Sequence, residues 1–442
     1  MRRLFGTDGV RGAFGRDLTT DLARELGRAA VVALARYERG SPTFVIGRDT
    51  RASGEPLEAA HVEGITGAGG DVYLAGVEPT PAIAFLTTGL SASSGIVISA
   101  SHNPPSDNGI KFFGPLGFKL SDEIEAEIES EVTRGDGGIG RPGQVRALPD
   151  AGHDYIDHVV ETAGARLDGM RVVVDCANGA ASVVAPQALR RLGAEVFPIF
   201  AEPDGSNINV GCGALHPEVV AAAVKSAGAD AGVAHDGDAD RALFADAEGN
   251  VIDGDQVLAA CALSMKAEDK LTGDLVVATV MANLGFHAAM KEAGIRVVPA
   301  PVGDRYVLEQ MQEHGAVLGG EQSGHVIFRR HATTGDGLIT AVQFLSLASR
   351  DGVSVADLAG RMRRFPQVLR NVEVARKESL DEASELWEAV RASETELGGT
   401  GRVLVRASGT EPLVRVMVEA ETEEIARRHA DALAERIRAA LG

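Results

Sequence analysis

A serine and a histidine stand side by side in the segment Ser99–Pro104, which directly follows an apolar run at Gly95–Ile98. Loops that follow the strands of α/β sheets are where such folds build their sites. A hydrolase triad is disfavoured, because the adjacent side chains of Ser101 and His102 point apart on an extended loop and because the Gly-x-Ser-x-Gly elbow is missing. Serine, asparagine and proline also make ordinary turns. A chemically active Ser101 and a plain turn therefore both stay open.

Three carboxylates, Asp236, Asp238 and Asp240, alternate in a segment that ends at Arg241 and follows a run of small residues. Such carboxylates repel one another unless a cation gathers them, and ligands that are all oxygen favour Mg²⁺. An EF-hand is excluded, because its sixth position would be Arg241 and its twelfth Ala247. A solvated acidic turn stays open. So does an aspartyl-nucleophile phosphatase, although Asp240 and Arg241 stand where that motif expects a small hydroxyl or apolar residue.

A third polar loop carries Glu321, Gln322, Ser323 and His325 between glycines, after an apolar strand end at Val317–Leu318. A carboxylate, an amide, a hydroxyl and an imidazole together can form a cradle for sugar hydroxyls. Loops of glycine and serine also connect strands without any function. Both interpretations stay open for this loop.

A fourth loop, Arg406–Pro412, combines arginine with hydroxyls and unobstructed backbone N–H groups, and Arg415 follows on the next apolar run. Forked guanidinium donors and a glycine-containing turn suit a phosphate dianion. A P-loop is excluded because the Gly-Lys-Ser/Thr ending is absent. A plain hairpin turn would need no arginine, so the pattern favours anion binding.

The elements that must position these loops follow an α/β pattern, in which short apolar runs alternate with helical segments. The clearest of the expected strands are residues 43–47, 95–99, 171–175, 231–234 and 275–280. Strands separated by amphipathic helices predict parallel or mixed sheets. In the first expected helix Leu22 and Leu26 share one face, and Asp21 is placed to cap the helix.

We predict three similar α/β domains, with mixed or parallel sheets, and a smaller C-terminal α+β domain. A Gly/Pro-rich stretch at 134–143 indicates a linker after the first domain. The pattern changes after Phe365-Pro366, where strands near 372–374, 402–405 and 413–418 and a final helix at 422–441 predict an antiparallel sheet. The predicted domains are residues 1–150, 151–255, 256–368 and 369–442.

Composition limits the classes of function. A chain of 442 residues exceeds a single core, and 45% hydrophobic with 24% charged residues is a globular composition. The net charge of −20 disfavours nucleic acid and acidic membranes as partners, so a phosphorylated ligand must meet a locally basic site. No apolar run approaches the roughly 18 residues of a membrane span, which predicts a cytoplasmic protein. The three separated cysteines are expected to be reduced thiols.

Taken in order with the opening segment Phe5–Gly12, the four loops resemble the α-D-phosphohexomutase superfamily over nearly the whole chain. The resemblance implies four domains around a central cleft. Within the superfamily, Phe5–Gly12 and Gln322 favour the members that interconvert glucosamine 6-phosphate and glucosamine 1-phosphate on the route to UDP-N-acetylglucosamine. By this similarity Ser101 is phosphorylated, its phosphoryl group passes to O1 of the substrate, and the 6-phosphoryl group of the resulting 1,6-bisphosphate returns to Ser101. Glucosamine or glucose 1,6-bisphosphate is thus the expected intermediate or activator.

The resemblance also assigns roles to individual residues. The expected catalytic residues are Ser101, Arg11, Lys111 and His325, with Lys111 or His325 assisting proton transfer. The expected ligands of one Mg²⁺ per subunit are Asp236, Asp238, Asp240 and the phosphorylated Ser101. The expected substrate-binding residues are Arg241, Glu321, Ser323, Arg406, Ser408, Gly409, Thr410 and Arg415. Among these, Glu321 and Ser323 would hold the 3- and 4-hydroxyls, and the fourth loop would hold the phosphate that does not react. Ala407 departs from the pattern, since relatives often carry proline there, and predicts a slightly less rigid loop.

Two alternatives remain at this stage. Ser101, the aspartates and the phosphate loop are shared across the superfamily, so the activity of a phosphomannomutase or phosphoglucomutase is the rival within the same chemistry. A phosphosugar-binding homologue without turnover is the rival from another class, although Ser101 and the aspartates are intact. The expected partner is a small phosphosugar, without nucleic acid or membrane, and a homodimer is the candidate assembly.

Overall fold

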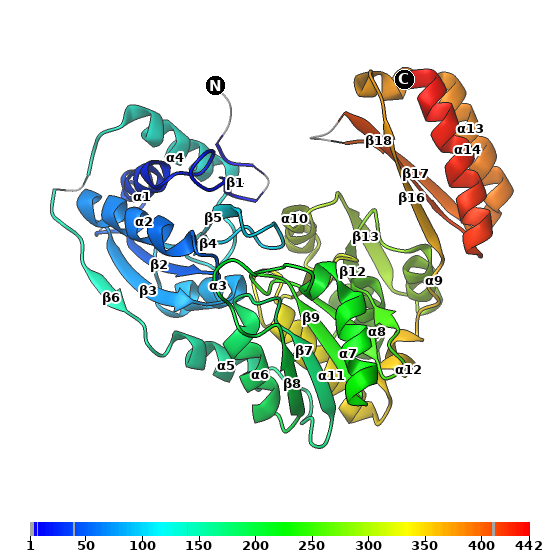
Figure 1. Cartoon of the computed structure of the whole chain (residues 1–442), viewed down its shortest axis with the longest axis horizontal. Coiled ribbons are helices and arrows are strands. Elements are labelled where there is room, and N and C mark those ends of the chain that lie inside the picture. Colours follow the sequence, from blue (N-terminus) through cyan, green and yellow to red (C-terminus); the bar gives the residue numbers. More distant parts are fainter. Residues whose placement is uncertain (1–3, 7, 39, 139, 409–411) are drawn as a thin grey trace. The chain divides into compact units, whose positions relative to one another are not determined.

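The computed structural model describes residues 4–6, 8–38, 40–138, 140–408 and 412–442. The chain forms two compact units, which we describe separately (Figure 1). The first comprises Met1–Met281 and Arg296–Gly360, and the second comprises Ala282–Ile295 and Arg361–Gly442. Within the described residues, the first unit contains three sheets and the second contains one.

The first sheet of the large unit has the order β1-β5-β4-β2-β3-β6. Its strands are β1 (Val10–Ala13), β2 (Thr43–Arg48), β3 (Asp71–Val77), β4 (Ser94–Ile98), β5 (Asp107–Phe113) and β6 (Val145–Ala147). Strands β4, β2, β3 and β6 pair in parallel, whereas β5 returns antiparallel to β4 and pairs antiparallel with β1. The associated helices are α1 (Thr20–Leu34), α2 (Gly54–Ala68), α3 (Thr80–Gly89) and α4 (Asp122–Arg134).

The first helix begins differently from the prediction. The side chain of Thr19, and not that of Asp21, caps α1 by accepting a hydrogen bond from the backbone N–H of Leu22. Asp21 lies in the first turn, where a carboxylate is favourable through the helix dipole. Both residues suit a helix start, and only the backbone conformation decides which one is the cap.

The second and third sheets of this unit have the orders β11-β10-β9-β7-β8 and β13-β12-β14-β15. The strands of the second are β7 (Arg171–Asp175), β8 (Glu195–Ile199), β9 (Ala231–His235), β10 (Ala242–Asp246) and β11 (Val251–Ile252), and those of the third are β12 (Leu275–Thr279), β13 (Arg296–Ala300), β14 (Leu318–Gly320) and β15 (Val326–Phe328). The helices are α5 (Ala151–Glu161), α6 (Ala181–Arg191), α7 (Pro217–Ala227), α8 (Gly254–Ala267), α10 (Asp304–His314), α11 (Gly337–Asp351) and α12 (Val355–Ala359).

One arrangement recurs in the three sheets and positions three of the four polar loops. In each sheet a buried strand that pairs in parallel with a neighbour leads into the loop, and the chain then returns as an antiparallel strand. The pairs are β4 with β5, β9 with β10 and β14 with β15. A short connection between neighbouring strands allows only this antiparallel return. The sheets are therefore mixed, and each loop is fixed at both of its ends.

The second unit is an antiparallel sheet of order β16-β18-β17, covered by helices. Its elements are α9 (Leu284–Glu292), β16 (Gln367–Glu373), α13 (Ser384–Leu397), β17 (Arg402–Ala407), β18 (Leu413–Glu419) and α14 (Glu423–Leu441). Alternate residues of β18, such as Val414 and Val416, pack with Leu433 and Ile437 of α14 in one core. The predicted fold class, three α/β domains with mixed sheets and a smaller α+β domain, is confirmed.

Two further observations concern classes of function. Across the part of the chain that the structure describes, no helix is both long and apolar enough to cross a membrane. Cys176, Cys212 and Cys261 are buried, and none of them forms a disulfide with another described residue.

Candidate active site

Ser101 lies on the loop between β4 and β5 in a conformation that few residues adopt. Its φ angle is +52°, in the left-handed region that is unfavourable for residues other than glycine. The side chain is fully buried, and its hydroxyl donates a hydrogen bond of 2.7 Å to Asp236 Oδ2. Strained backbone of this kind persists only where the surroundings hold it in place, and it is concentrated at functional sites.

Arg51 holds this loop together with Asn209, whose Nδ2 donates to the carbonyl oxygens of Ser101 at 2.8 Å and Asn103 at 3.2 Å. The buried guanidinium of Arg51 donates to the carbonyl oxygens of Ser101 at 3.0 Å and of Asn103 at 2.8 Å, and also to those of Pro104 and Asp107. Its Nε donates to Asp49 Oδ2 at 2.9 Å. Arg51 and Asp49 are both almost completely inaccessible to solvent, so their charges must compensate each other.

The prediction that the side chains of Ser101 and His102 point apart is wrong. His102 Nδ1 lies 3.3 Å from Ser101 Oγ, because the positive φ angle of Ser101 turns the chain back on itself instead of leaving it extended. Burial, followed by the charges of Arg241 and Arg11, lowers the pKa of His102 to about 4. The serine proton nevertheless points toward Asp236, so the contact does not reproduce a hydrolase triad.

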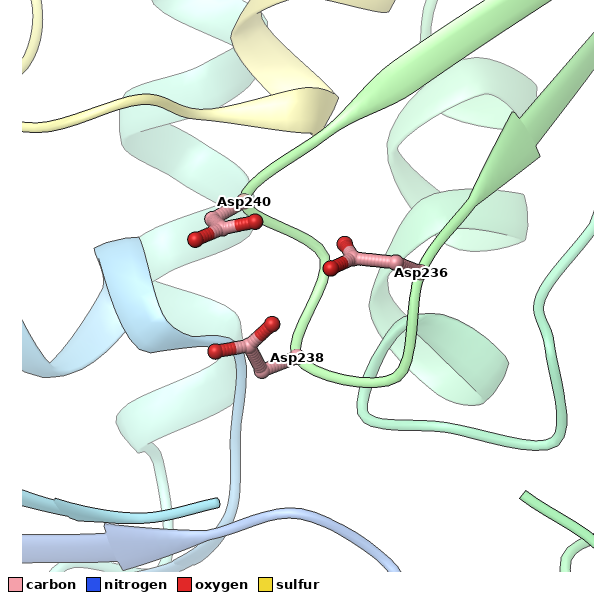
Figure 2. Close-up of side chains that lie close together, drawn as sticks. All are labelled: Asp236, Asp238 and Asp240. Atoms are coloured by element: carbon pink, nitrogen blue, oxygen red, sulfur yellow. The ribbon is translucent and has the colours of Figure 1, made fainter. Parts of the chain in front are cut away.

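The three aspartates converge on the loop between β9 and β10 (Figure 2). Each offers a carboxylate oxygen, and these oxygens lie within 4.8 Å of one another. All three residues are buried. Burial and the neighbouring charges of Asp240 and Asp238 raise the pKa of Asp236 well above its usual range. The negative charges of the three carboxylates are therefore not fully balanced by the neighbouring cations.

The aspartate cluster fits a bound cation. Asp238 Oδ1 and Asp240 Oδ1 are buried and accept no hydrogen bond from any described residue. Leaving buried carboxylate oxygens without a partner is costly, and a hard cation is the partner that oxygen ligands prefer. The three aspartates thus lie close together, as predicted, and their geometry is compatible with a metal site.

Asp238 joins this cluster to the first sheet. Its Oδ2 accepts hydrogen bonds from Thr80 Oγ1 at 2.7 Å and from Lys111 Nζ at 2.8 Å. Lys111 is also 3.3 Å from Asp8 Oδ2. Asp8 in turn forms ion pairs with Arg11 and with Lys119, the latter at 2.8 Å. Burial and Asp240 oppose the ionisation of Asp238, but Lys111 outweighs them and lowers its pKa.

His325 lies against the other end of the cluster. Its Nδ1 is 3.6 Å from Asp240 Oδ2, and its Nε2 accepts a hydrogen bond of 3.1 Å from the backbone N–H of Gly335. Burial opposes the charged imidazole, but the contact with Asp240 and the charge of that residue raise the pKa of His325 to about 8. The two ring nitrogens are thus both engaged within the protein.

The third polar loop lies beside the start of α10. Glu321 Oε1 accepts a hydrogen bond of 2.9 Å from the backbone N–H of Gly303, and Ser323 Oγ donates to Glu321 Oε2 at 3.3 Å. Arg241, at the end of the aspartate loop, has its Nε 3.8 Å from Asp240 Oδ1. The structure therefore joins Ser101, the three aspartates, Lys111 and His325 in one network, whereas the side chains of Glu321 and Ser323 contact each other and Gly303.

The fourth loop belongs to the second unit. Arg406 on β17 stands directly opposite Arg415 on β18, and the two positive charges lie close together. Burial and then Arg415 lower the pKa of Arg406. Ser408 is buried, and its carbonyl oxygen accepts a hydrogen bond of 2.8 Å from Lys377 Nζ. Gly409 and Thr410, also predicted to bind phosphate, lie outside the described residues.

Several residues in or beside this network were not predicted. Asp8 stands in the opening segment without an assigned role, and Arg51 and Asp304 lie in stretches without any motif. Lys119 lines the same narrow cavity as Asp8 and Asp304, and burial lowers its pKa to about 8. Because buried positive charges need negative partners, carboxylates could have been expected beside Lys111 and Arg11. The sequence does not show which carboxylates these are.

Comparison with known proteins agrees with this geometry. Family models of phosphoglucomutase/phosphomannomutase match four segments, namely α/β/α domain I at 2–137, domain II at 153–249, domain III at 253–365 and the C-terminal domain at 369–436. A phosphoglucosamine mutase of Pelotomaculum thermopropionicum is 55% identical over 424 residues, covering 95% of each chain.

Two solved structures share the fold. A phosphoglucomutase/phosphomannomutase family protein of Burkholderia thailandensis superposes with a TM-score of 0.84 at 26% identity, covering 100% of this chain and 98% of that one. An N-acetylphosphoglucosamine mutase of Aspergillus fumigatus, solved with GlcNAc-6P and magnesium, has a TM-score of 0.69 at 17% identity and covers 99% and 96%. With four domain models matched in order and a relative of 55% identity along almost the whole chain, the protein belongs to the phosphoglucomutase/phosphomannomutase family of the α-D-phosphohexomutases.

Proposed function

We propose that the protein has phosphoglucosamine mutase activity and interconverts glucosamine 6-phosphate and glucosamine 1-phosphate through a phosphoserine at residue 101. The observation that carries this proposal is the contact of 2.7 Å between Ser101 Oγ and Asp236 in a buried group of three aspartates. A phosphoryl group on that oxygen would lie at the carboxylate cluster. Phosphoryl transfer depends mainly on positioning and charge neutralisation, so no general base next to the serine is needed.

Asp236, Asp238 and Asp240 would hold a divalent cation, Mg²⁺ by the chemistry of the donors, with the phosphorylated Ser101 as a further ligand. When bound, such a cation neutralises charge on a transferring phosphoryl group. The chain's own contribution is the orientation of the ligands, because Thr80 and Lys111 fix one oxygen of Asp238 and leave the other free. Arg11 adds a guanidinium that is anchored by Asp8 and donates to the carbonyl oxygen of Ala100 at 3.4 Å.

The phosphoryl group would move in two transfers. In the first, the bond between phosphorus and Ser101 Oγ breaks as O1 of glucosamine 6-phosphate attacks, and the O1 proton passes to a base. The 1,6-bisphosphate then turns over, the phosphoryl group on O6 returns to Ser101 Oγ, and O6 takes up a proton. Lys111 and His325 are the predicted groups for these proton transfers. Both groups are engaged within the protein, Lys111 with Asp238 and Asp8 and His325 with Asp240 and Gly335, so both stay candidates.

The remaining predicted residues would bind the sugar and its second phosphate. Glu321 and Ser323, already joined by a hydrogen bond, would hold the 3- and 4-hydroxyls, with Arg241 beside them. The paired guanidinium groups of Arg406 and Arg415 suit a dianion. The residues proposed for the phosphate that does not react are Arg406, Ser408, Gly409, Thr410 and Arg415.

The choice of glucosamine is supported by the relatives. The protein of Pelotomaculum thermopropionicum that is 55% identical carries the name phosphoglucosamine mutase, and identity of this degree covers 95% of both chains. We propose accordingly that the reaction supplies glucosamine 1-phosphate to UDP-N-acetylglucosamine synthesis in the cytoplasm, that glucosamine or glucose 1,6-bisphosphate activates the enzyme, and that it works as a homodimer. Domain boundaries after residues 150, 255 and 368 are part of the same proposal.

A direct comparison of substrates tests the proposal. Turnover of the 6-phosphates of glucosamine, glucose and mannose is measured with Mg²⁺ and a catalytic amount of glucose 1,6-bisphosphate. The account predicts the highest kcat/KM for glucosamine 6-phosphate. A higher value for the glucose or mannose compound would replace it by phosphoglucomutase or phosphomannomutase activity, and turnover of none would favour a binding protein.

A further inference from the structure

The narrow cavity beside the aspartate cluster contains one carboxylate that the proposed mechanism does not use. Its charged lining comprises the acids Asp8, Asp240 and Asp304 and the bases Lys111, Lys119, Arg305 and His325. Asp304 is the first residue of α10, and its side chain is partly buried at this cavity. All of these residues belong to the large unit.

The cations of the cavity already have carboxylate partners. Lys111 and Lys119 pair with Asp8, and Lys111 also donates to Asp238. Arg305 pairs with Asp122 and with Glu309.

Asp304, by contrast, takes part in no hydrogen bond or ion pair of its side chain with any residue that the structure describes. The carboxylate does not cap its own helix, because the N-cap position is Gly303 and no side-chain hydrogen bond is made there. The charges of Lys119, His325 and Lys111 attract this half-buried carboxylate, but it accepts no hydrogen bond from a described residue and can therefore accept one from a ligand.

The position of Asp304 relative to the third polar loop indicates which group it meets. The preceding residue, Gly303, donates its backbone N–H to Glu321 Oε1 at 2.9 Å, and Ser323 Oγ lies 3.3 Å from the other oxygen of the same carboxylate. The start of α10 is thus fixed to the loop proposed to hold the 3- and 4-hydroxyls. On a hexosamine the amino group at C2 is the neighbour of the 3-hydroxyl. A carboxylate next to that loop is the group that an ammonium requires.

We propose that Asp304 binds the 2-ammonium group of the sugar and makes the site selective for hexosamine phosphates over hexose phosphates. This inference rests on the proposed mutase function and adds the residue that sets its substrate class. Asp8 contributes indirectly, because it engages Lys111 and Lys119, whose charges would otherwise repel an ammonium. A hydroxyl in place of the ammonium keeps a hydrogen bond to Asp304 but loses the charge, and charge-assisted hydrogen bonds are roughly twice as strong as neutral ones.

The test is the ratio of kcat/KM for glucosamine 6-phosphate to kcat/KM for glucose 6-phosphate, measured with Mg²⁺ and glucose 1,6-bisphosphate. Asp304→Asn and Asp304→Ser both remove the charge, and serine also suits a helix start. We expect the ratio to fall by about 10- to 100-fold in each, as for the loss of one hydrogen bond to a charged group. Asp304→Glu keeps the charge, so its ratio should be higher than the ratio of either neutral variant.

The matched control is Asp122→Asn, which removes a carboxylate that pairs with Arg305 and does not itself line the cavity. Its ratio should equal that of the unmodified enzyme. An unchanged ratio in both neutral Asp304 variants would overturn the inference while leaving the mutase function in place. A general loss of activity on both sugars with an unchanged ratio would do the same, since it would mark a structural role. A preference of the unmodified enzyme for glucose 6-phosphate would contradict the proposed function itself.

Discussion

Substitutions at Arg51 can distinguish a role in the stability of the fold from a role in positioning Ser101. The Arg51 guanidinium serves two purposes at once, since it balances the buried charge of Asp49 and donates to the carbonyl oxygens of Ser101 and Asn103. Arg51→Met ends both functions. The double substitution Arg51→Met with Asp49→Leu removes the carboxylate that would otherwise be left alone, but it also removes the acceptor of the Ser99 hydroxyl.

The magnitudes follow from burial. Breaking a buried ion pair by removing one partner costs about 3–5 kcal/mol, whereas replacing both partners by apolar residues is often close to neutral. Burial raises the pKa of Asp49 even with Arg51 beside it, so in Arg51→Met the carboxyl should bind a proton more readily still. We expect Arg51→Met to lower the stability of the first domain by about 3–5 kcal/mol at pH 8 and by less at pH 5. The double variant should recover only part of this loss, because the Ser99 hydroxyl loses its acceptor and the loop carbonyls lose the guanidinium.

Amide hydrogen exchange in β4 and β5, followed by mass spectrometry, reports the free energy of opening in the strands that flank the serine loop. Mutase activity is measured on the same samples. The double variant should be more stable than Arg51→Met but at least about tenfold less active, because the loop carbonyls lose the guanidinium and the oxygens of Ser101 and Asn103 keep Asn209 as their side-chain donor among the described residues. The reasoning fails if Arg51→Met costs less than about 1 kcal/mol, or if the double variant has full activity.

Three further predictions concern the metal, the packing of the loops and pH. Asp238→Asn should weaken Mg²⁺ binding by at least about tenfold in titration calorimetry, because it removes one anionic ligand, and equal affinity would exclude Asp238 from the metal site. Gly237→Ala would place a methyl carbon 2.6 Å from the carbonyl oxygen of Ser101. The two loops must then separate, so we expect a loss of activity of roughly tenfold or more with the melting temperature little changed, and full activity would argue against the close approach. Burial raises the pKa of Glu78 from 4.5 to about 7, so the folded protein binds this proton more tightly than the unfolded chain. The associated stability is present below pH 4.5 and is lost as the pH rises toward 7. Glu78→Gln should therefore raise the melting temperature at pH 8, by the equivalent of about 3 kcal/mol, and hardly at pH 5, whereas a gain that did not depend on pH would contradict this origin.

The fold class and the four loops could be predicted from the sequence because their signals are local. Apolar runs such as the one before Ser101 indicate buried strands, and the alternating aspartates indicate a cation site without knowledge of their neighbours. Mixed sheets could be anticipated only in part. The antiparallel return of β5 depends on the backbone of the Ser101 loop, where a left-handed serine reverses the chain. No propensity predicts a serine in that conformation, and the same feature caused the wrong expectation for His102.

The partners that hold the site could not be predicted, because they are set by distances between segments that are remote in sequence. Arg51 reaches Ser101 across 50 positions, and Asp8 reaches Lys119 across 111. A single aspartate or arginine outside a motif carries no local signal, since charged residues are common on surfaces. Such residues can be recognised as part of a site because buried charges must be paired. Whether a residue is buried is known only from the structure.

The central claim is that Ser101 carries the phosphoryl group, and transfer of a radioactive label tests it most directly. The enzyme is mixed with glucose 1,6-bisphosphate labelled in its phosphates, quenched within one turnover and digested, and the labelled peptide is sequenced. The account predicts an acid-stable label on Ser101, formed as fast as turnover, and neither label nor mutase activity in Ser101→Ala. An acid-labile label on Asp236, or undiminished activity in Ser101→Ala, would contradict the account and favour an aspartyl nucleophile.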